Sequence, residues 1–385
     1  MTTKVPEIPV VLPGSSINRS AADLGRAPEH LQPLARRLIE HGAGARAEAE
    51  GRAGQIRLSM DEYSVPIETV DVSVDMASKA AQESSGWWNV AVFPAGWSID
   101  AGTTGNLRAG TLVPMRFRPG SRPTSAAQID LLPGAGNDGL LLIEDVKANK
   151  CWRHWMFRQN DWNALHLANL GPLLAKSPYT VGICNAGTSL HRPYGPGADP
   201  RGERGMGLIK RALVTTAAEV ASGRIGHAAE LSIEGTWYCD DLRTAREGVD
   251  WLAPARRCEW VKGQKGRPNG FDPSRRALLS PEGLRVAFWV DRDRRRDFVY
   301  ERVSDGPMRA FWVVIVDQWC DYGFIVAETG GYGMRQEMTG LRGSDRKVYV
   351  ERWGWDPDDV VRQEAALADF ANVFIDDAYV VNPVH

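Results

Sequence analysis

Short apolar runs separated by turn-forming residues constrain the fold of this chain more than any other feature of its sequence. From Trp87 onward these strand-like runs read VAVFP, TLVPMRF, GLLLIEDV, KCWRHWMF and HAAELSIEGTW. Glycine, proline, asparagine and aspartate lie between them, and several short strands with such turn signals are typical of β-sandwiches and jelly rolls. The sequence therefore predicts a mainly β fold, a jelly-roll or concanavalin-like sandwich with a few helices.

The last third of the chain mixes helical and strand-like patterns. The run at 308–323 can form a buried helix followed by the strand FIVAET, although periodicity alone leaves that choice open. The segment at 356–374 predicts a helix more clearly, because its acidic start suits the helix dipole and its apolar residues share one face. We expect this helix to close the body at its C-terminal end.

The first 76 residues differ in texture from the rest. They begin with a proline-containing extended stretch, and Leu31, Leu34, Leu38 and Ile39 then form a short helical stripe. A short helix cannot bury such a stripe alone, so it should dock on another surface. The run IETVDVSVDM at 67–76 alternates like a strand. We interpret 1–76 as an extended, partly helical attachment arm and 77–385 as the β-sandwich body.

Overall charge and hydropathy exclude several classes of partner. The 385 residues carry a formal net charge of -2, which provides no general attraction for nucleic acid. No run approaches 18 uninterrupted apolar residues, so we expect no membrane insertion. The opening MTTKVPEIPVVLPGSS lacks a charged region followed by a long apolar run, so we expect no secretory signal peptide.

Cysteines and common motifs favour a protein without a metal or cofactor. The five cysteines are widely spaced, form no CxxC motif and are expected to be buried free thiols. The seven histidines show no metal-ligand spacing on a helix. GAGNDG at 134–139 fits the dinucleotide-binding pattern by letter, but a strand follows it where a helix is required, so a turn is the better interpretation.

Acidic residues in or beside predicted strands keep a glycosidase possible. These residues are Asp138, Glu144, Asp145, Glu230 and Glu234. Glu230 and Glu234 share strand parity but are separated by about 13 Å along a strand, farther than the roughly 5 Å or 6.5–9.5 Å that hydrolysis requires. Neighbouring strands would have to bring a pair of carboxylates together. Solvated carboxylates on an outward face are the alternative interpretation.

Several short motifs occur together in one order. They are Asp138-Gly139, the GRIGHA turn at 223–228, Pro254-Ala255-Arg256, Gly283-Leu284-Arg285 and GFIVAE at 323–328. In this order the chain resembles, from about Trp87 to Trp355, a family of β-rich domains found in secreted bacterial proteins and in minor tail proteins of phages that infect actinobacteria. The family often has an acidic aromatic run where this chain reads CWRHWMF, so catalytic chemistry placed there would be missing.

The resemblance implies a virion protein rather than an enzyme. We expect a structural minor tail protein at or near the tail tip, made in the host cytoplasm, present in multiple symmetric copies and bound to other tail proteins. It would mediate tail assembly and contact with the host cell surface, where cell-wall glycan is a possible ligand. The alternative is a polysaccharide-cleaving enzyme, a glycoside hydrolase or lyase, on the same fold.

Four residues are candidates for ligand binding, and no catalytic residue is assigned. The candidates are Asp138, His227, Glu230 and Arg256. His227 begins the alternation Ala229, Leu231, Ile233, and a histidine at a strand entrance can bond a backbone carbonyl through one nitrogen and a side chain through the other. We therefore expect His227 to order its turn. The enzyme alternative instead requires a groove that holds His227, Arg256 and at least one carboxylate from Asp138, Glu144 or Glu230.

Overall fold

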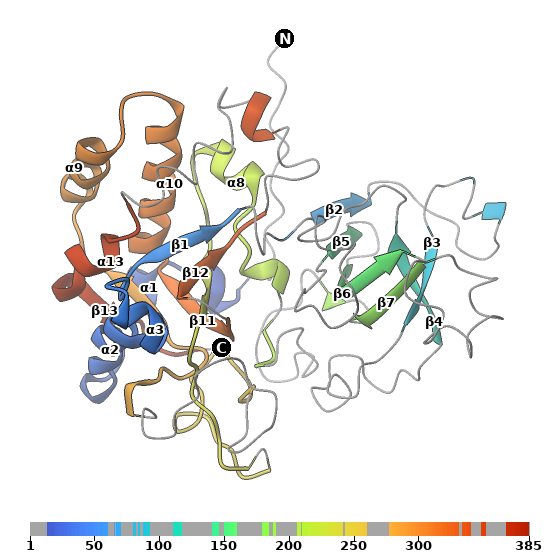
Figure 1. The fold of residues 1–385 in the computed structure, drawn as a ribbon, viewed down its shortest axis with the longest axis horizontal. Coiled ribbons are helices and arrows are strands. Elements are labelled where there is room, and N and C mark those ends of the chain that lie inside the picture. Colours follow the sequence, from blue (N-terminus) through green and yellow to red (C-terminus); the bar gives the residue numbers. More distant parts are fainter. Residues whose placement is uncertain are drawn as a thin grey trace.

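A computed structural model describes residues 14–60, 210–241, 243–259, 277–330 and 367–384, together with shorter pieces between them. Between 61 and 205 it describes chiefly the strands. The described elements form two sheets, each in its own part of the molecule (Figure 1). Among the described residues no helix is long and apolar enough to cross a membrane.

The first sheet has six strands and mixed pairing. Its order is β1-β12-β9-β11-β10-β13. The pairs β1–β12 and β11–β9 are parallel, and the remaining three pairs are antiparallel. The strand bounds are β1 Ile56–Ser59, β9 Ala229–Ile233, β10 Arg285–Phe288, β11 Phe324–Thr329, β12 Met334–Glu337 and β13 Ala378–Val380.

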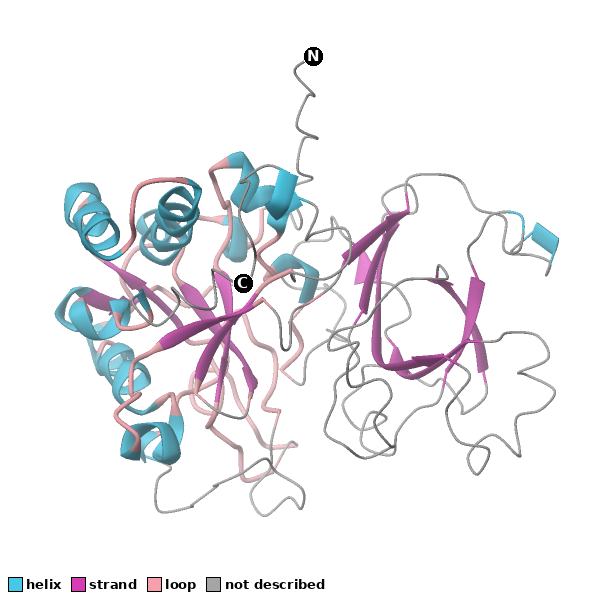
Figure 2. Ribbon diagram, turned by 45° about the horizontal axis from the view of Figure 1, so that its top comes forward, coloured by secondary structure: helices cyan, strands magenta, loops and turns pink. Residues whose placement is uncertain are grey.

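Helices surround this sheet, as the cyan ribbons of Figure 2 show. Their bounds are α1 Ala21–Leu24, α2 Pro33–His41, α3 Gly44–Ala49, α8 Ala217–Ser222, α9 Arg292–Arg302, α10 Pro307–Asp321 and α13 Phe370–Val373. Single 3-10 turns are η1 Ser16–Asn18, η2 Glu29–Leu31, η4 Lys210–Ala212 and η6 Ile375–Asp377. Asp291 caps α9 by accepting from the backbone N–H groups of Asp293 and Arg294, so the arginine-rich run at 292–302 is a helix.

Strand alternation assigns the two faces of the six-stranded sheet to two cores. Ala229, Leu231 and Ile233 of β9 belong to the main core, which also contains the apolar residues of α2, α9, α10 and α13. Ile325 and Ala327 of β11 point the other way, into a smaller core with residues of the segment 206–213. Because side chains alternate along a strand, Glu230 and Ser232 lie on the face away from the main core.

The second sheet has seven strands and is built from the middle of the chain. Its order is β2-β5-β6-β7-β3-β4, with β8 paired to β6. The bounds are β2 Ile67–Val70, β3 Trp88–Val92, β4 Thr111–Phe117, β5 Leu141–Asp145, β6 Lys150–Gln159, β7 Tyr179–Cys184 and β8 Thr188–Ser189. In Figure 2 these strands curve around a common centre, to one side of the helical part.

A small apolar cluster joins the two parts. Val65 and Leu142, on the side of the seven-stranded sheet, are fully buried against Val214, and the partly buried Ile67 packs on them. An ion pair between Arg211 and Glu144 of β5 accompanies this contact, with 3.3 Å between Nε and Oε2. The segment that covers the first sheet is therefore also the one that meets the second.

Most elements expected from the sequence are present, whereas a jelly-roll sandwich is not confirmed. The strand-like runs form β3, β4, β5, β6, β9 and β10, and the ambiguous run at 308–323 forms helix α10 followed by strand β11. The mixed six-stranded sheet packs against helices, where a sandwich would place a second sheet. Of the helix expected at 356–374, the structure describes α13, and 356–366 lie outside the described residues.

The segment expected to form an attachment arm contributes to the body. The predicted stripe on α2 is buried at Leu34, Leu38 and Ile39, in the same core as β9 and α10. Strand β1 pairs with β12 along four residue positions, and β2 extends the second sheet. The expected boundary at residue 76 therefore does not divide the chain into an arm and a body, because β1 and β2, which precede it, are strands of the two sheets. Residues 1–13 lie outside the described residues.

Three residues of the short ordered motifs hold the backbone of the first sheet. Gly283 and Gly323 have φ of +81° and +72°, and a Cβ there would collide with the carbonyl oxygens of Leu252 and Val286. Arg285, buried in β10, donates to the carbonyl oxygens of Tyr322, Ser16 and Arg19 at 2.7, 2.7 and 2.8 Å. Burial lowers the pKa of Arg285 to about 9.

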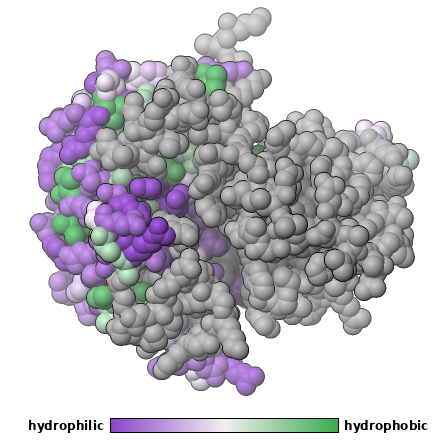
Figure 3. Space-filling model, viewed as in Figure 1, coloured by the Kyte–Doolittle hydropathy of each residue, from purple (hydrophilic) through white to green (hydrophobic). Residues whose placement is uncertain are grey.

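The described surface of the helical part is predominantly hydrophilic on the face that Figure 3 shows, with scattered apolar residues. The large apolar side chains exposed among the described residues are Val249, Trp289, Tyr300, Val350 and Val373. Single exposed apolar residues are normal on a protein surface and need no explanation. Trp289 stands out because 68% of its surface is exposed.

Two glycines provide a matched test of the backbone argument. Gly223 has φ of +80° and open space where a Cβ would lie, whereas at Gly323 a Cβ would meet Val286. We expect Gly223→Ala to cost about 1 kcal/mol of unfolding free energy. Gly323→Ala should cost about 1–3 kcal/mol more, because it adds a steric collision. Urea unfolding measures both values, and equal losses would contradict the close approach at Gly323.

Candidate functional site

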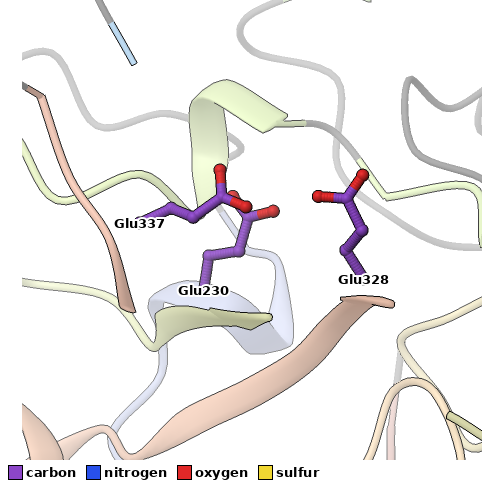
Figure 4. Close-up of side chains that lie close together, drawn as sticks. All are labelled: Glu230, Glu328 and Glu337. Atoms are coloured by element: carbon purple, nitrogen blue, oxygen red, sulfur yellow. The ribbon is translucent and has the colours of Figure 1, made fainter. Parts of the chain in front are cut away.

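A group of buried charged side chains lies on the face of the six-stranded sheet that points away from the main core. Glu230 of β9 and Glu337 of β12 are 0% and 6% exposed, and Lys210 of η4 is fully buried. Glu328 of β11 is partly exposed. Figure 4 shows the three carboxylates rising from their strands toward the same region. We call these four residues the carboxylate–lysine cluster.

Lys210 supplies the positive charge within this cluster. Its Nζ lies 2.9 Å from Oε1 of Glu230 and also forms an ion pair with Glu337. The hydroxyl of Ser232 donates to Oε1 of Glu337 at 2.6 Å. Because buried charges are stable only when they are paired and hydrogen-bonded, Lys210 makes it possible for β9 and β12 to carry glutamates on a covered face.

The three carboxylates are close enough to share a cation. One oxygen from each of Glu230, Glu328 and Glu337 lies within 4.8 Å of the others, and this is the one such group among the described residues. A donor set of oxygens alone suits Mg²⁺, Ca²⁺ or Mn²⁺ better than zinc or copper. In the structure, however, the neighbouring positive group is the ammonium of Lys210.

The same spacing bears on the glycosidase alternative. Carboxyl groups about 5 Å apart are the arrangement of a retaining glycosidase. Such a pair must reach the sugar from both sides of the scissile bond, whereas Glu230 is fully buried and bound to Lys210. The carboxylates are therefore near one another, but only Glu328 is partly exposed, and Glu230 lacks the exposure that the reaction requires.

His227 belongs to a second group, at the turn before β9. Its Nδ1 lies 2.8 Å from the carbonyl oxygen of Ala228, and its Nε2 lies 3.2 Å from Oε1 of Glu219. Only 4% of His227 is exposed. The side chain therefore bonds a backbone carbonyl through one nitrogen and faces a carboxylate through the other, as expected for a histidine that orders its turn.

Glu219 is held in place by the start of α8. Its carboxylate accepts hydrogen bonds from the N–H and the hydroxyl of Thr216, at 3.0 and 2.8 Å, and its own N–H donates to the threonine hydroxyl. This reciprocal arrangement is a capping box, which satisfies the free donors at a helix start. The glutamate thus links α8 to the His227 turn.

The electrostatic environment keeps Glu219 ionised. Burial by itself raises the pKa of this carboxyl, but the charge and hydrogen bond of His227, the charge of Arg211 and the N–H of Thr216 outweigh burial. The resulting pKa is lowered to about 2. A depressed carboxyl pKa means that the folded state binds this proton less well than the unfolded state, so ionised Glu219 stabilises the fold.

A polar network on the opposite face fastens the His227 turn to α10. Gln318 Nε2 donates to the carbonyl oxygen of His227 at 3.2 Å and to the hydroxyl of Thr215 at 3.0 Å. Gln336 Nε2 donates to Gln318 at 2.9 Å, and the indole of Trp319 donates to Gln336 at 2.6 Å. Buried polar groups that are satisfied in this way make the arrangement of strand and helix specific.

The four residues proposed from the sequence have separate surroundings. His227 contacts Glu219, and Glu230 belongs to the carboxylate–lysine cluster. Arg256 is partly buried, its N–H donates to the carbonyl oxygen of Met206 at 2.9 Å, and its Cβ lies close to Gly207. Asp138 lies outside the described residues. The structure thus assigns His227 and Glu230 to internal contacts of the fold.

Sequence reasoning missed Lys210, Glu328 and Glu337 as neighbours of Glu230. The strands FIVAET and MRQE each place a glutamate near their end, which is a weak signal by itself. What brings the residues together is the pairing of β9 with both β11 and β12, including a register shift between Val326 and Glu328. Strand order is a tertiary property, and no local pattern reports it.

Comparison with known proteins adds no relative. No family model matches the chain, and neither a curated protein nor a solved structure matches it.

Removal of the Lys210 ammonium from the carboxylate–lysine cluster should have a large effect on stability. Lys210→Met should lower the unfolding free energy by about 3–5 kcal/mol, because it removes the ammonium that pairs with two buried carboxylates. The double variant Lys210→Met/Glu230→Gln should recover part of this loss, since it removes one of the two carboxylate charges. Urea unfolding of wild type and the variants measures the coupling. Wild-type stability in Lys210→Met would contradict the ion pairs.

Glu219 predicts acid sensitivity in a defined pH window. Its stabilising effect is fully present above the ordinary pKa of 4.5 and is lost as the pH falls toward the folded-state value of about 2. Between pH 5 and pH 3 this group alone should remove about 2 kcal/mol of unfolding free energy. Glu219→Gln should lack this component, so urea unfolding of both proteins across that range tests it. Parallel pH curves would contradict the assignment.

Proposed function

We propose that this protein is a structural minor tail protein of a phage that infects actinobacteria. In this proposal it lies at or near the tail tip, binds other tail proteins in multiple symmetric copies, and contacts the host cell surface. The ordered motifs between Asp138 and Glu328 suggest the family, and the mixed six-stranded body provides the framework. The jelly-roll sandwich that the resemblance implies stays a prediction.

The observation that carries the proposal is the structural role of two charged motif residues, Arg285 and His227, which are both buried. Arg285 bonds three backbone carbonyls, and His227 bonds one carbonyl and faces one carboxylate. The motif glycines Gly283 and Gly323 permit close approaches of the backbone. Residues with such architectural roles are expected in a protein whose work is assembly, and buried in this way they offer a polysaccharide no reactive group.

The polysaccharide-cleaving alternative has one favourable observation, the close carboxylates of the carboxylate–lysine cluster. The burial of His227 and Glu230 argues against this alternative, because a catalytic acid or base must come within hydrogen-bonding distance of the substrate. The two functions therefore differ in a measurable way: an adhesin binds host glycan and leaves it intact, whereas an enzyme releases new reducing ends or unsaturated products.

Trp289 is the described residue that best suits contact with a glycan. It is 68% exposed, and its ring lies 6.3 Å from that of Tyr379. The backbone N–H of Trp289 donates to the carbonyl oxygen of Asp377, whose side chain forms an ion pair with Arg294. An exposed indole can stack on a sugar face, and charged neighbours can bond its hydroxyls. Several copies on one tail would add avidity to weak single contacts.

The test is incubation of the purified protein with host cell-wall polysaccharide, measuring both binding and product release. We expect binding without release in wild type and in His227→Ala. Trp289→Ala should weaken binding about 3–10-fold, because it removes one stacking contact. The matched control is Tyr300→Ala, which removes another exposed aromatic ring, on α9.

Each other outcome has a defined meaning. Release that disappears in His227→Ala would establish the enzyme and overturn the adhesin. Binding that is equal in wild type and Trp289→Ala would exclude Trp289 as the contact. A protein that neither binds nor releases would lack the surface-contact role, and the proposal would then be reduced to tail assembly.

A further inference from the structure

Two buried cysteines lie side by side in the long connection between β9 and β10. Cys239 is 0% exposed and Cys258 is 2% exposed. The side chain of each cysteine is a hydrogen-bond partner of the other. The Sγ of Cys258 also lies 3.4 Å from the carbonyl oxygen of Asp250. Neither forms a disulfide in the structure.

The backbone around these thiols is held on both sides. Trp237 N–H donates to the carbonyl oxygen of Ser280 at 2.8 Å, and Leu252 N–H donates to that of Glu282 at 2.9 Å. A bridge between Thr236 and Ser280 adds to the first contact. Each cysteine is therefore within a few residues of a point where the connection is fastened to the segment before β10. The two sulfurs meet because the fold brings them together.

We infer that Cys239 and Cys258 are the partners of a disulfide bond that forms in an oxidising environment. The bond would close a loop of the chain that contains the exposed residues 246–249. Such cross-links stabilise mainly by restricting the unfolded chain. The inference does not rest on the proposed function, although a particle outside the cell would meet the oxidising conditions in which disulfides persist.

The chemistry balances with a disulfide such as oxidised glutathione as the oxidant. One cysteine thiolate attacks the glutathione disulfide and releases one glutathione, and the second cysteine attacks the resulting mixed disulfide and releases the other. Each protein thiol loses its hydrogen, and one glutathione disulfide becomes two glutathione thiols. Burial raises the pKa of both Cys239 and Cys258. The folded dithiol should therefore react slowly, and formation during refolding should be faster.

The alternative use of two neighbouring thiols is a metal site. Zinc requires four ligands in a structural site. Among the described residues, the only group of three or more ligand-type side chains gathered closely is that of Glu230, Glu328 and Glu337, and it contains neither cysteine. Two thiols outside any such group favour a covalent bond between them.

The test maps the cysteines after oxidation. One sample of the reduced full-length protein is treated while folded with glutathione disulfide, and a second is unfolded, reduced and refolded in a glutathione redox mixture. Both are then denatured, alkylated with iodoacetamide, digested with trypsin and analysed by mass spectrometry. Trypsin releases Cys239 in the peptide 225–243 and Cys258 in the peptide 258–262.

We expect a linked pair of these two peptides, lighter by two hydrogen atoms than their sum, which disappears on reduction. Cys320, which is also buried, should stay alkylated, and Cys320→Ser should leave the linked pair unchanged. In Cys239→Ser, Cys258 should be alkylated. Alkylation of both Cys239 and Cys258 in both samples, or linkage of either one to a different cysteine, would overturn the inference.

Discussion

The ion pairs of Lys210 are the interaction that holds the segment carrying it against the six-stranded sheet. They neutralise Glu230 and Glu337 on a sheet face that would otherwise expose two carboxylates to a covered, poorly solvated space. The segment that carries Lys210 also carries Arg211, which pairs with Glu144, and Val214, which packs against Leu142. One short segment therefore covers the first sheet and meets the second.

Charge pairing also explains the local order around His227. Glu219 caps the start of α8, faces His227 and remains ionised, while Gln318 bonds the carbonyl oxygen of His227 from the other side of the sheet. The turn before β9 is thus held by a helix on one side and by α10 on the other. A residue placed in this way has a clear structural reason to be histidine.

The architectural roles of the motif residues determine which functions remain attractive. A polysaccharide-cleaving site needs groups that substrate can reach, whereas His227 and Glu230 are buried in contacts inside the fold. A tail component needs a stable body with a surface for neighbours, and here Arg285 and His227 lie inside the body while Trp289 is exposed. The carboxylate–lysine cluster then holds η4 against the six-stranded sheet, and the paired thiols of Cys239 and Cys258 would secure the connection between β9 and β10.

Local patterns in the sequence determined the secondary structure well. The alternation Ala229, Leu231, Ile233 predicted β9 and its buried face, and the spacing of Leu34, Leu38 and Ile39 predicted α2. The expectation that His227 bonds a carbonyl and a side chain also followed from its place before a strand. These features depend on neighbours within a few residues, which is the range over which side-chain periodicity carries information.

Only the tertiary structure decided the order of the strands and the partners of the charges. A helical stripe such as that of α2 must be covered, but its pattern does not say which surface covers it. For this reason the sequence indicated an attachment arm, whereas α2 packs on the sheet of the same chain. Similarly, the distance between Glu230 and Glu337 depends on the pairing of β9 with β12, across more than a hundred residues of chain. Long-range contacts of this kind follow from the packing of whole elements, and short sequence patterns cannot contain them.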